Sequence, residues 1–96
     1  MKTKQMYPDN IVLWFYSPSI LEVFMSEELQ DERIENYLRG LLISGEVMTV
    51  SSRKSITQNF AAHSVLILDE NRLTVQKKIA EYLNSIGYES IIEEPE

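Results

Sequence analysis

The sequence predicts a small α+β domain with the ferredoxin-like order strand, helix, strand, strand, helix, strand. Three observations predict it: a run of β-favouring residues at 11–16, two stretches of apolar residues at helical spacing, and a strand-helix-strand pattern over 64–93. In this two-layer sandwich the first and third strands are central, the other two lie at the edges, and both helices cover one face of the sheet.

The two central strands leave a second architecture open. Residues 11–16 and 65–68 are apolar throughout, whereas 47–51 and 88–93 carry polar side chains. A strand that is apolar on both sides is typical of a sheet covered on both faces. Either a partner, a second copy or a ligand covers the face that the helices leave, or the chain is a small three-layer α/β fold with a mainly parallel sheet.

The N-terminal half supplies the first strand and the first helical region. Residues 1–10 are expected to form a mobile arm, and 11–96 the single α/β domain. Ser17 and Pro18 are typical of a helix N-cap and first helical position, so a helix is expected to begin there and to break near Ser26, where its apolar stripe ends. A second helical segment then ends between Gly40 and Gly45. Its core-facing positions are Ile34, Tyr37, Leu38, Leu41 and Leu42.

The C-terminal half supplies the remaining elements. Residues 46–51 are expected to form a weaker strand, 52–63 a polar loop or one helical turn, and 64–69 a strand beside 11–16. A helix is expected from Asn71 until Gly87 stops it, and 88–93 as the last strand. The apolar positions of that helix are Val75, Ile79, Leu83 and Ile86.

This C-terminal segment resembles the opening strand, helix and strand of a response-regulator receiver domain. The resemblance rests on VLILDEN at 65–71 and on AEYL at 80–83 followed by GY at 87–88. It implies that Asp69 and Glu70, the acidic pair after the strand, help to hold a magnesium ion. The match covers under a third of the chain and ends before a phosphoacceptor strand, so phosphotransfer is not expected. The other interpretation is a strand-end turn in which Asp69 or Asn71 caps the helix.

Composition excludes several classes of function. Fifteen acidic and nine basic residues give a net charge of −6, the wrong sign for holding a phosphate backbone, so no direct nucleic-acid partner is expected. The chain has no cysteine, which excludes disulfides and thiolate metal sites. The apolar run at 11–15 is too short for a signal core or a membrane span, which favours a cytoplasmic protein with no membrane partner.

Acidic residues crowd the segment between the two helical stretches. The cluster consists of Glu27, Glu28, Asp31, Glu32 and Glu35. A helix dipole stabilises carboxylates in a first turn, yet like charges four residues apart cost a few tenths of a kcal/mol each. The cluster is either a solvated helix face or an acidic surface for a basic partner protein, with the second interpretation including mimicry of nucleic-acid phosphates.

Two further features of the sequence contain side chains that can take part in binding or catalysis. Arg53 and Lys54 lie among serines and threonines in the expected loop, a composition that suits a small anion or an exposed loop. His63 is the only histidine and has no obvious nucleophile, so a buried or rim imidazole is expected rather than a general base. No catalytic, cofactor or metal site is predicted, and we expect a non-enzymatic protein.

These observations lead to three hypotheses of function. The first is a protein–protein interaction or regulatory module, a homodimer that acts through its sheet face and acidic helix. The second is an acidic inhibitor or nucleic-acid mimic directed at a basic partner through residues 27–35. The third is a small-molecule sensor or enzyme with a site near Ser17, Arg53, Lys54 and His63, although a fold alone does not establish a ligand.

Overall fold

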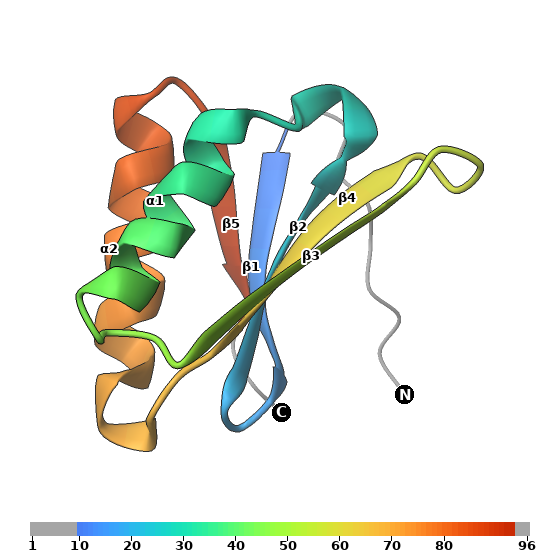
Figure 1. Ribbon diagram of the computed structural model, residues 1–96. Coiled ribbons are helices and arrows are strands. Elements are labelled where there is room, and N and C mark those ends of the chain that lie inside the picture. Colours follow the sequence, from blue (N-terminus) through green and yellow to red (C-terminus); the bar gives the residue numbers. More distant parts are fainter. Residues whose placement is uncertain (1–9, 94–96) are drawn as a thin grey trace.

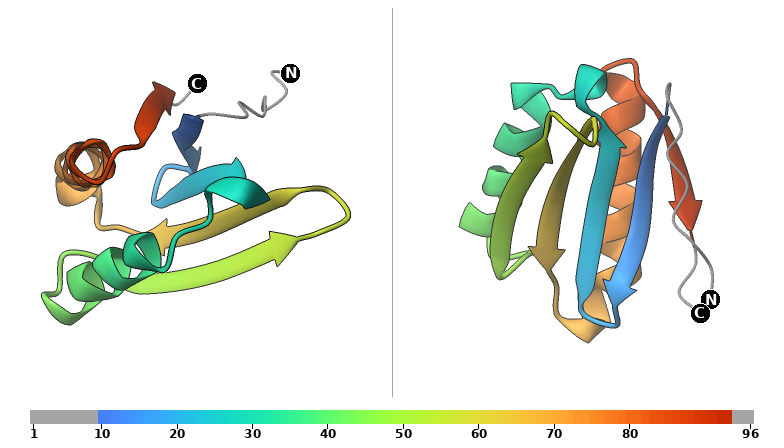
Figure 2. Two further views of the ribbon diagram at one scale, coloured as in Figure 1. Left: turned by 90° about the horizontal axis from the view of Figure 1, so that it is seen from above. Right: turned by 90° about the vertical axis from the view of Figure 1, so that its right-hand side faces the viewer.

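The computed structural model describes residues 10–93, which form one five-stranded sheet covered by two helices on one face (Figure 1). The elements are β1 (Asn10–Ser17), β2 (Ile20–Ser26), the 3-10 turn η1 (Glu27–Leu29), α1 (Glu32–Ile43), β3 (Thr49–Ser55), β4 (Phe60–Leu66), the 3-10 turn η2 (Asp69–Asn71), α2 (Arg72–Ser85) and β5 (Glu89–Glu93). The fold is therefore α+β with two layers. The three-layer alternative is wrong, since both helices lie on the same face (Figure 2).

The sheet departs from the predicted ferredoxin-like order by one strand. Its order is β3-β4-β2-β1-β5, and without β1 the remaining four strands would follow the predicted arrangement with β2 as the first strand. β1 lies between β2 and β5, antiparallel to β2 and parallel to β5. The expected neighbours, 64–69 and 11–16, are thus separated by β2, and that prediction is wrong. The edge positions expected for 46–51 and 88–93 are confirmed, because β3 and β5 are the edge strands.

A β-hairpin replaces the helix that was expected to begin at Ser17. Pro18 and Ser19 form the turn, and β2 returns along β1 with Leu13 opposite Val23. Proline presets the backbone angle of a turn as readily as that of a first helical residue, so the Ser-Pro pair fits both structures. The segment after it is rich in aromatic and β-branched residues, and pairing with β1 and β4 decides its conformation.

The loop expected at 52–63 is also wrong, because most of it belongs to β3 and β4. These strands pair antiparallel from Thr49 opposite Leu66 to Ser55 opposite Phe60. The turn between them ends at Asn59, whose φ of 56° lies in the left-handed region that asparagine tolerates. Polar side chains are compatible with this strand because β3 is an edge strand and almost all its residues are exposed.

Both helices are confirmed close to their expected bounds. Asp31 caps α1 by accepting the backbone N–H of Arg33 at 2.9 Å. Gly45 and Gly87, with φ of 82° and 96°, follow the C-termini of α1 and α2, where left-handed backbone lets the chain reverse. The expected core positions Val75, Ile79 and Leu83 of α2 are buried.

The core lies between the helices and one face of the sheet. Alternate residues of each strand point into it, as the strand period of two requires. The sheet contributes Ile11, Leu13, Phe15, Leu21, Val23, Met25, Ala61 and Val65, and the helices contribute Ile34, Leu38, Leu41, Val75, Ile79 and Leu83. We call this the helix face of the sheet and the opposite side the outer face.

The ends of the chain bear on two predictions. The expected N-terminal arm lies outside the described residues except for Asn10, which belongs to β1 and pairs with Glu89. Neither helix within residues 10–93 has the length and apolar character that crossing a membrane requires.

Candidate functional site

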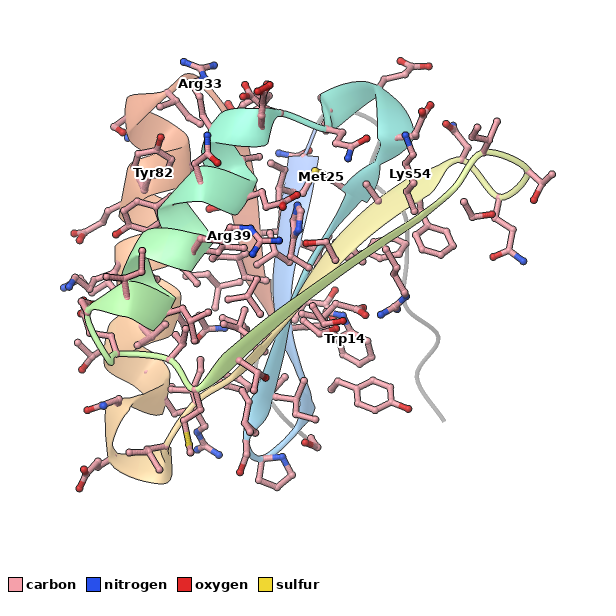
Figure 3. All side chains as sticks on the ribbon, in the orientation of Figure 1. Trp14, Met25, Arg33, Arg39, Lys54 and Tyr82 are labelled. Carbon is pink, nitrogen blue, oxygen red and sulfur yellow. The ribbon has the colours of Figure 1, made fainter. Side chains whose placement is uncertain are left out.

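A cluster of aromatic and charged side chains lies on the outer face of the sheet. Strand pairing aligns Trp14 with Glu22, and Glu22 with Ser64, so these side chains project from the same face in a row across three strands. Figure 3 shows Trp14 on the side of the sheet away from Arg39 of α1 and Tyr82 of α2. The outer-face cluster is defined as Trp14, Tyr16, Glu22, Arg53 and Phe60.

A buried carboxylate forms the centre of this cluster. Glu22 is only 2% exposed, yet it accepts a hydrogen bond from Trp14 Nε1 at 2.8 Å and pairs with the Arg53 guanidinium at 2.6 Å. Arg53 reaches it from β3, two strands away in the sheet, and also approaches Ser64 Oγ at 3.4 Å. A buried charge is tolerated when an opposite charge and hydrogen bonds compensate for its lost hydration. The contact therefore orders Arg53 across the face.

Aromatic rings flank the ion pair on both sides. Trp14 and Tyr16 meet edge to face with centroids 5.9 Å apart, and Phe24 stacks on Phe60 at 5.4 Å. The Arg53 guanidinium lies 5.8 Å from the centre of the Phe60 ring. Tyr16 remains 68% exposed and half of the Arg53 side chain is exposed. Tryptophan, tyrosine and arginine are the residue types most enriched among the energetically dominant residues of protein interfaces.

Not all of the outer face is open to solvent. Val12, Phe24 and Ala62 point to this side and are 1%, 7% and 0% exposed. Of the two runs that the sequence predicted to be apolar on both sides, 11–16 is buried on the outer side at Val12 but exposed at Tyr16, and 65–68 ends in the half-exposed Leu68. Among residues 10–93 no helix lies over the outer face (Figure 2).

The predicted acidic residues gather at one end of the molecule. Glu27 and Glu28 lie in η1, which contacts the β3–β4 turn through the bond from Glu27 N–H to the Asn59 carbonyl at 3.2 Å. Asp31, Glu32 and Glu35 follow at the start of α1. The start of β5 lies close to these acidic residues, because the hydroxyl of Tyr88, just before β5, donates to Asp31 Oδ2 at 2.8 Å. We call Glu27, Glu28, Asp31, Glu32 and Glu35 the acidic end.

Two of these five carboxylates are held within the protein. Asp31 accepts from the Arg33 backbone, the Arg33 guanidinium at 2.7 Å and Tyr88, and these bonds, those of Arg33 above all, lower the pKa of its carboxyl. Glu35 pairs with Arg39 at 2.9 Å along the helix. Asp31 is thus a structural cap as well as part of the predicted surface.

Arg53 and Lys54 do not lie in a loop, which corrects the sequence interpretation. They are successive residues of β3, so their side chains point to opposite faces of the sheet. Arg53 lies on the outer face with Glu22, whereas Lys54 pairs with Ala61 on the side of the helices. A shared anion site at these two residues stays a prediction, and the geometry does not bring the two side chains together.

His63 is buried on the helix face, as expected for a structural imidazole. It is 2% exposed, and its Nδ1 lies 2.7 Å from Ser52 Oγ, while Nε2 has no partner among the described residues. Burial lowers the pKa of this imidazole, and the nearby charges of Glu35 and Arg39 act on the pKa in opposite directions. Uncharged His63 is therefore the form that the fold favours at neutral pH.

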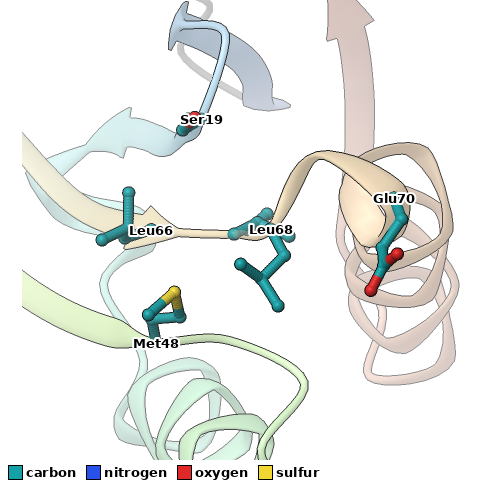
Figure 4. Close-up of a pocket in the computed structure, with 6 residues that line it drawn as sticks. Ser19, Met48, Leu66, Leu68 and Glu70 are labelled. Atoms are coloured by element: carbon teal, nitrogen blue, oxygen red, sulfur yellow. The ribbon is translucent and has the colours of Figure 1, made fainter.

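An open pocket of about 500 Å³ lies at the other end of the sheet (Figure 4). Apolar side chains dominate its wall, and Met48 and Leu68 remain about half exposed. Ser19 and Glu70 are the polar residues at its rim. The residues of the proposed sensor site, near Ser17, Arg53, Lys54 and His63, do not line it. Glu70 and Asp69 belong to η2, and the described residues contain no group of three or more metal-ligating side chains.

Glu22 and its contacts with Trp14 and Arg53 were missed by sequence reasoning, which expected Trp14 only to be a core or interface residue. The segment that contains Glu22 was expected to be helical, and Arg53 was placed in a loop, so no pattern brought them together. One signal was present: Glu22 is the single charged residue in the apolar run 20–25. A lone carboxylate in an otherwise apolar strand requires a cation nearby.

Comparison with protein-family models, curated proteins and solved structures finds no match for this chain.

Proposed function

We propose that the protein is a non-enzymatic protein–protein interaction module that uses the outer face of its sheet as the binding surface. The observation that carries the proposal is the outer-face cluster, in which the Glu22–Arg53 ion pair holds an arginine beside the half-buried ring of Phe60, with Tyr16 exposed in the same cluster. A side chain that is already ordered loses little conformational entropy on binding. The partner contacted by this face is therefore expected to be a protein surface with an apolar centre and a polar rim.

The burial of Glu22 supports the same proposal. An ion pair costs hydration energy, and replacing it with apolar residues is often neutral for stability. Its presence across β2 and β3 instead holds Arg53 in one place, over Phe60 and beside Ser64. The positions of Trp14 and Arg53 thus depend on the same carboxylate, so both sides of the surface are ordered together.

The experiment is affinity capture from the native host with matched baits. The wild-type chain is compared with Tyr16→Ala and with Arg53→Met, and a third bait, Glu28→Lys with Glu32→Lys, serves as a control for charge. We expect the outer-face variants to capture at least tenfold less of the partner than the wild-type chain does. Interface hot spots contribute 2 kcal/mol or more, which is roughly thirtyfold in affinity. The charge control is expected to retain it.

The outcome with the charge control separates the two leading functions. Loss of the partner with Glu28→Lys and Glu32→Lys, and its retention by Tyr16→Ala, would overturn binding through the outer face. Circular dichroism of each bait before capture shows whether the variant is folded, so that loss of binding can be distinguished from unfolding.

A second candidate function is an acidic inhibitor of a basic protein, acting through the acidic end. The bond from Tyr88 to Asp31 favours it, because this bond brings the start of β5, with Glu89, to the same end as α1. Three elements, η1, the first turn of α1 and the start of β5, then present carboxylates at this end. Binding of this kind is expected to weaken steeply with added salt, whereas binding through the outer face is expected to weaken little.

A further inference from the structure

We propose that two copies of the protein pair antiparallel along the free edge of β3, with Ser52 of each copy facing Ser52 of the other on a two-fold axis. This pairing goes beyond the proposed function, since it concerns the edge of the sheet and not its outer face.

The free edge of β3 has no strand paired to it within residues 10–93, although β3 also contacts α1. Its seven residues are exposed or half-buried, and within residues 10–93 its sole strand partner is β4. An edge strand presents a row of backbone N–H and C=O groups that another strand can pair with. β3 contains no proline and no bulge to prevent this, and the β3–β4 hairpin extends away from the helices (Figure 1). Both edge strands contact a helix, β5 with α2 and β3 with α1, and β5 is the shorter, with five residues against seven.

The register follows from the length of the strand and from its two faces. When helices of both copies lie on one side of a continuous sheet, helix-face residues must oppose helix-face residues. Pairing centred on Ser52 meets this condition: it sets Val50 opposite Lys54 of the second copy and Thr49 opposite Ser55. It also engages all seven residues of β3, because Ser52 is the midpoint of Thr49–Ser55. Pairing centred on Ser51 would leave two residues of each strand unpaired.

Like charges exclude the registers centred on the residues that follow Ser52. Pairing centred on Arg53 or on Lys54 would place like charges directly opposite each other, which destabilises a sheet. In the Ser52 register the two Lys54 residues are offset by four positions, or roughly 13 Å along the strand, beyond the screening length of about 8 Å at physiological salt. Arg53 is already neutralised by Glu22 of its own chain. β3 can therefore pair antiparallel with β3 of a second copy in the register centred on Ser52.

A dimer of this kind joins two five-stranded sheets into one continuous sheet. Both outer-face clusters then lie on the same side, so a partner with two matching sites would bind with increased avidity. Pairing of seven residues along one edge buries less surface than the roughly 1,200 Å² of a standard stable interface. We therefore expect association at micromolar concentrations rather than a permanent dimer.

The absence of cysteine from the chain allows a direct test by single-cysteine cross-linking. Ser52→Cys, Thr49→Cys and Ser55→Cys are compared under mild oxidation. Side chains directly opposite each other across two strands have Cβ atoms about 5 Å apart, close to disulfide distance, whereas two Thr49 residues would be roughly 20 Å apart. We expect Ser52→Cys to form covalent dimers roughly tenfold or more faster than either control, because pairing gives its thiols a high effective concentration.

Two further measurements keep the proposal open to refutation. A mixture of Thr49→Cys and Ser55→Cys is expected to form a mixed dimer faster than either variant alone, since these positions face each other. Sedimentation of the wild-type chain is expected to show reversible dimers as concentration rises. A wild-type monomer at high micromolar concentration, or cross-linking of Ser52→Cys no faster than Thr49→Cys, would overturn the pairing. Either result leaves binding through the outer face unaffected.

Discussion

The two faces of the sheet each bury one ionisable group, and they accommodate it in different ways. On the outer face, Glu22 is charged and is paired with Arg53 and Trp14. On the helix face, His63 has one hydrogen-bond partner, the Ser52 hydroxyl, and burial lowers the pKa of its ring. A carboxylate that stays charged needs compensating groups, whereas an imidazole can enter an apolar core by remaining neutral. The helix face is therefore built for packing, and the outer face for display of ordered polar and aromatic groups.

The largest effect is expected from truncating a side chain of the helix face. Leu13→Ala removes a fully buried residue of β1 and is expected to lower the free energy of unfolding by about 2–5 kcal/mol, through lost burial and a cavity. Tyr16→Ala, in the same strand but exposed on the outer face, is expected to change it by less than about 1 kcal/mol. Urea denaturation measures both. Equal losses would contradict the assignment of packing to one face.

A smaller loss is expected from breaking the ion pair of the outer face. Arg53→Met leaves the buried Glu22 carboxylate without this cation and is expected to lower the free energy of unfolding by about 1–3 kcal/mol. Replacing both partners, with Glu22→Leu added, is expected to restore part of the loss, because the second change removes the buried carboxylate. A double-mutant cycle measured by denaturation gives the coupling. Strict additivity would show that the pair does not order this face.

The buried imidazole of the helix face predicts a dependence of stability on pH. Because the pKa of His63 is lower in the folded protein than its ordinary value of 6.5, the unfolded chain takes up the proton first. Stability is therefore complete above about pH 6.5 and falls as pH decreases through this value, by at most about 1.4 kcal/mol per pH unit. Thermal or urea unfolding at pH 7.5 and pH 5.5 measures the loss.

Two variants distinguish this effect from that of the acidic end. His63→Gln is expected to flatten the profile between pH 7.5 and pH 5.5. The pKa of Asp31 is lowered by Arg33 and Tyr88, so its contribution is present above an ordinary carboxyl pKa near 4 and is lost below it. Asp31→Asn is thus expected to leave the loss near pH 6 in place. A profile that His63→Gln does not change would contradict the role given to the imidazole.

The smallest effect is expected where the sheet meets the first helix. Tyr88→Phe removes the hydroxyl that donates to Asp31 and is expected to cost about 0.5–1.5 kcal/mol. The same change in an Asp31→Asn background is expected to cost less, because the charged acceptor is already gone. Urea denaturation of the four proteins checks this. An equal cost in both backgrounds would mean that the phenol acts through packing alone.

The sequence predicted the parts of the fold that local patterns determine. The apolar spacing of α1 and α2 and the glycines that follow them lie within single segments, and both helices were predicted with nearly their observed bounds, although the Asp31 cap of α1 was not. The hairpin at Pro18 and the strands around Asn59 were missed, because Ser-Pro fits a helix start as well as a turn and because a polar edge strand has the composition of a loop. The acidic end was located by sequence, but its connection to Tyr88 was not.

The outer-face cluster lay beyond what local patterns reveal. Glu22 and Arg53 are 31 positions apart, and only the sheet order brings β2 and β3 to either side of β4. The departure from the ferredoxin-like order has the same origin. β1 and β5 lie at opposite ends of the described sequence, and no local pattern shows that two such strands pair. The position of β1 between β2 and β5 was therefore not predicted.

The position of β1 has a consequence for how the chain folds during synthesis. Its parallel partner β5 is the last of the strands within residues 10–93 to be synthesised, and their pairing joins Asn10 to Glu89, 79 positions apart. Contacts between residues so distant in the chain form late and slowly. Until β5 is available, β1 exposes the backbone of Ile11, Val12 and Leu13 as an apolar edge, which is prone to pair with other chains. Shortening β5 is thus expected to favour aggregation of nascent protein before it lowers the stability of the finished fold.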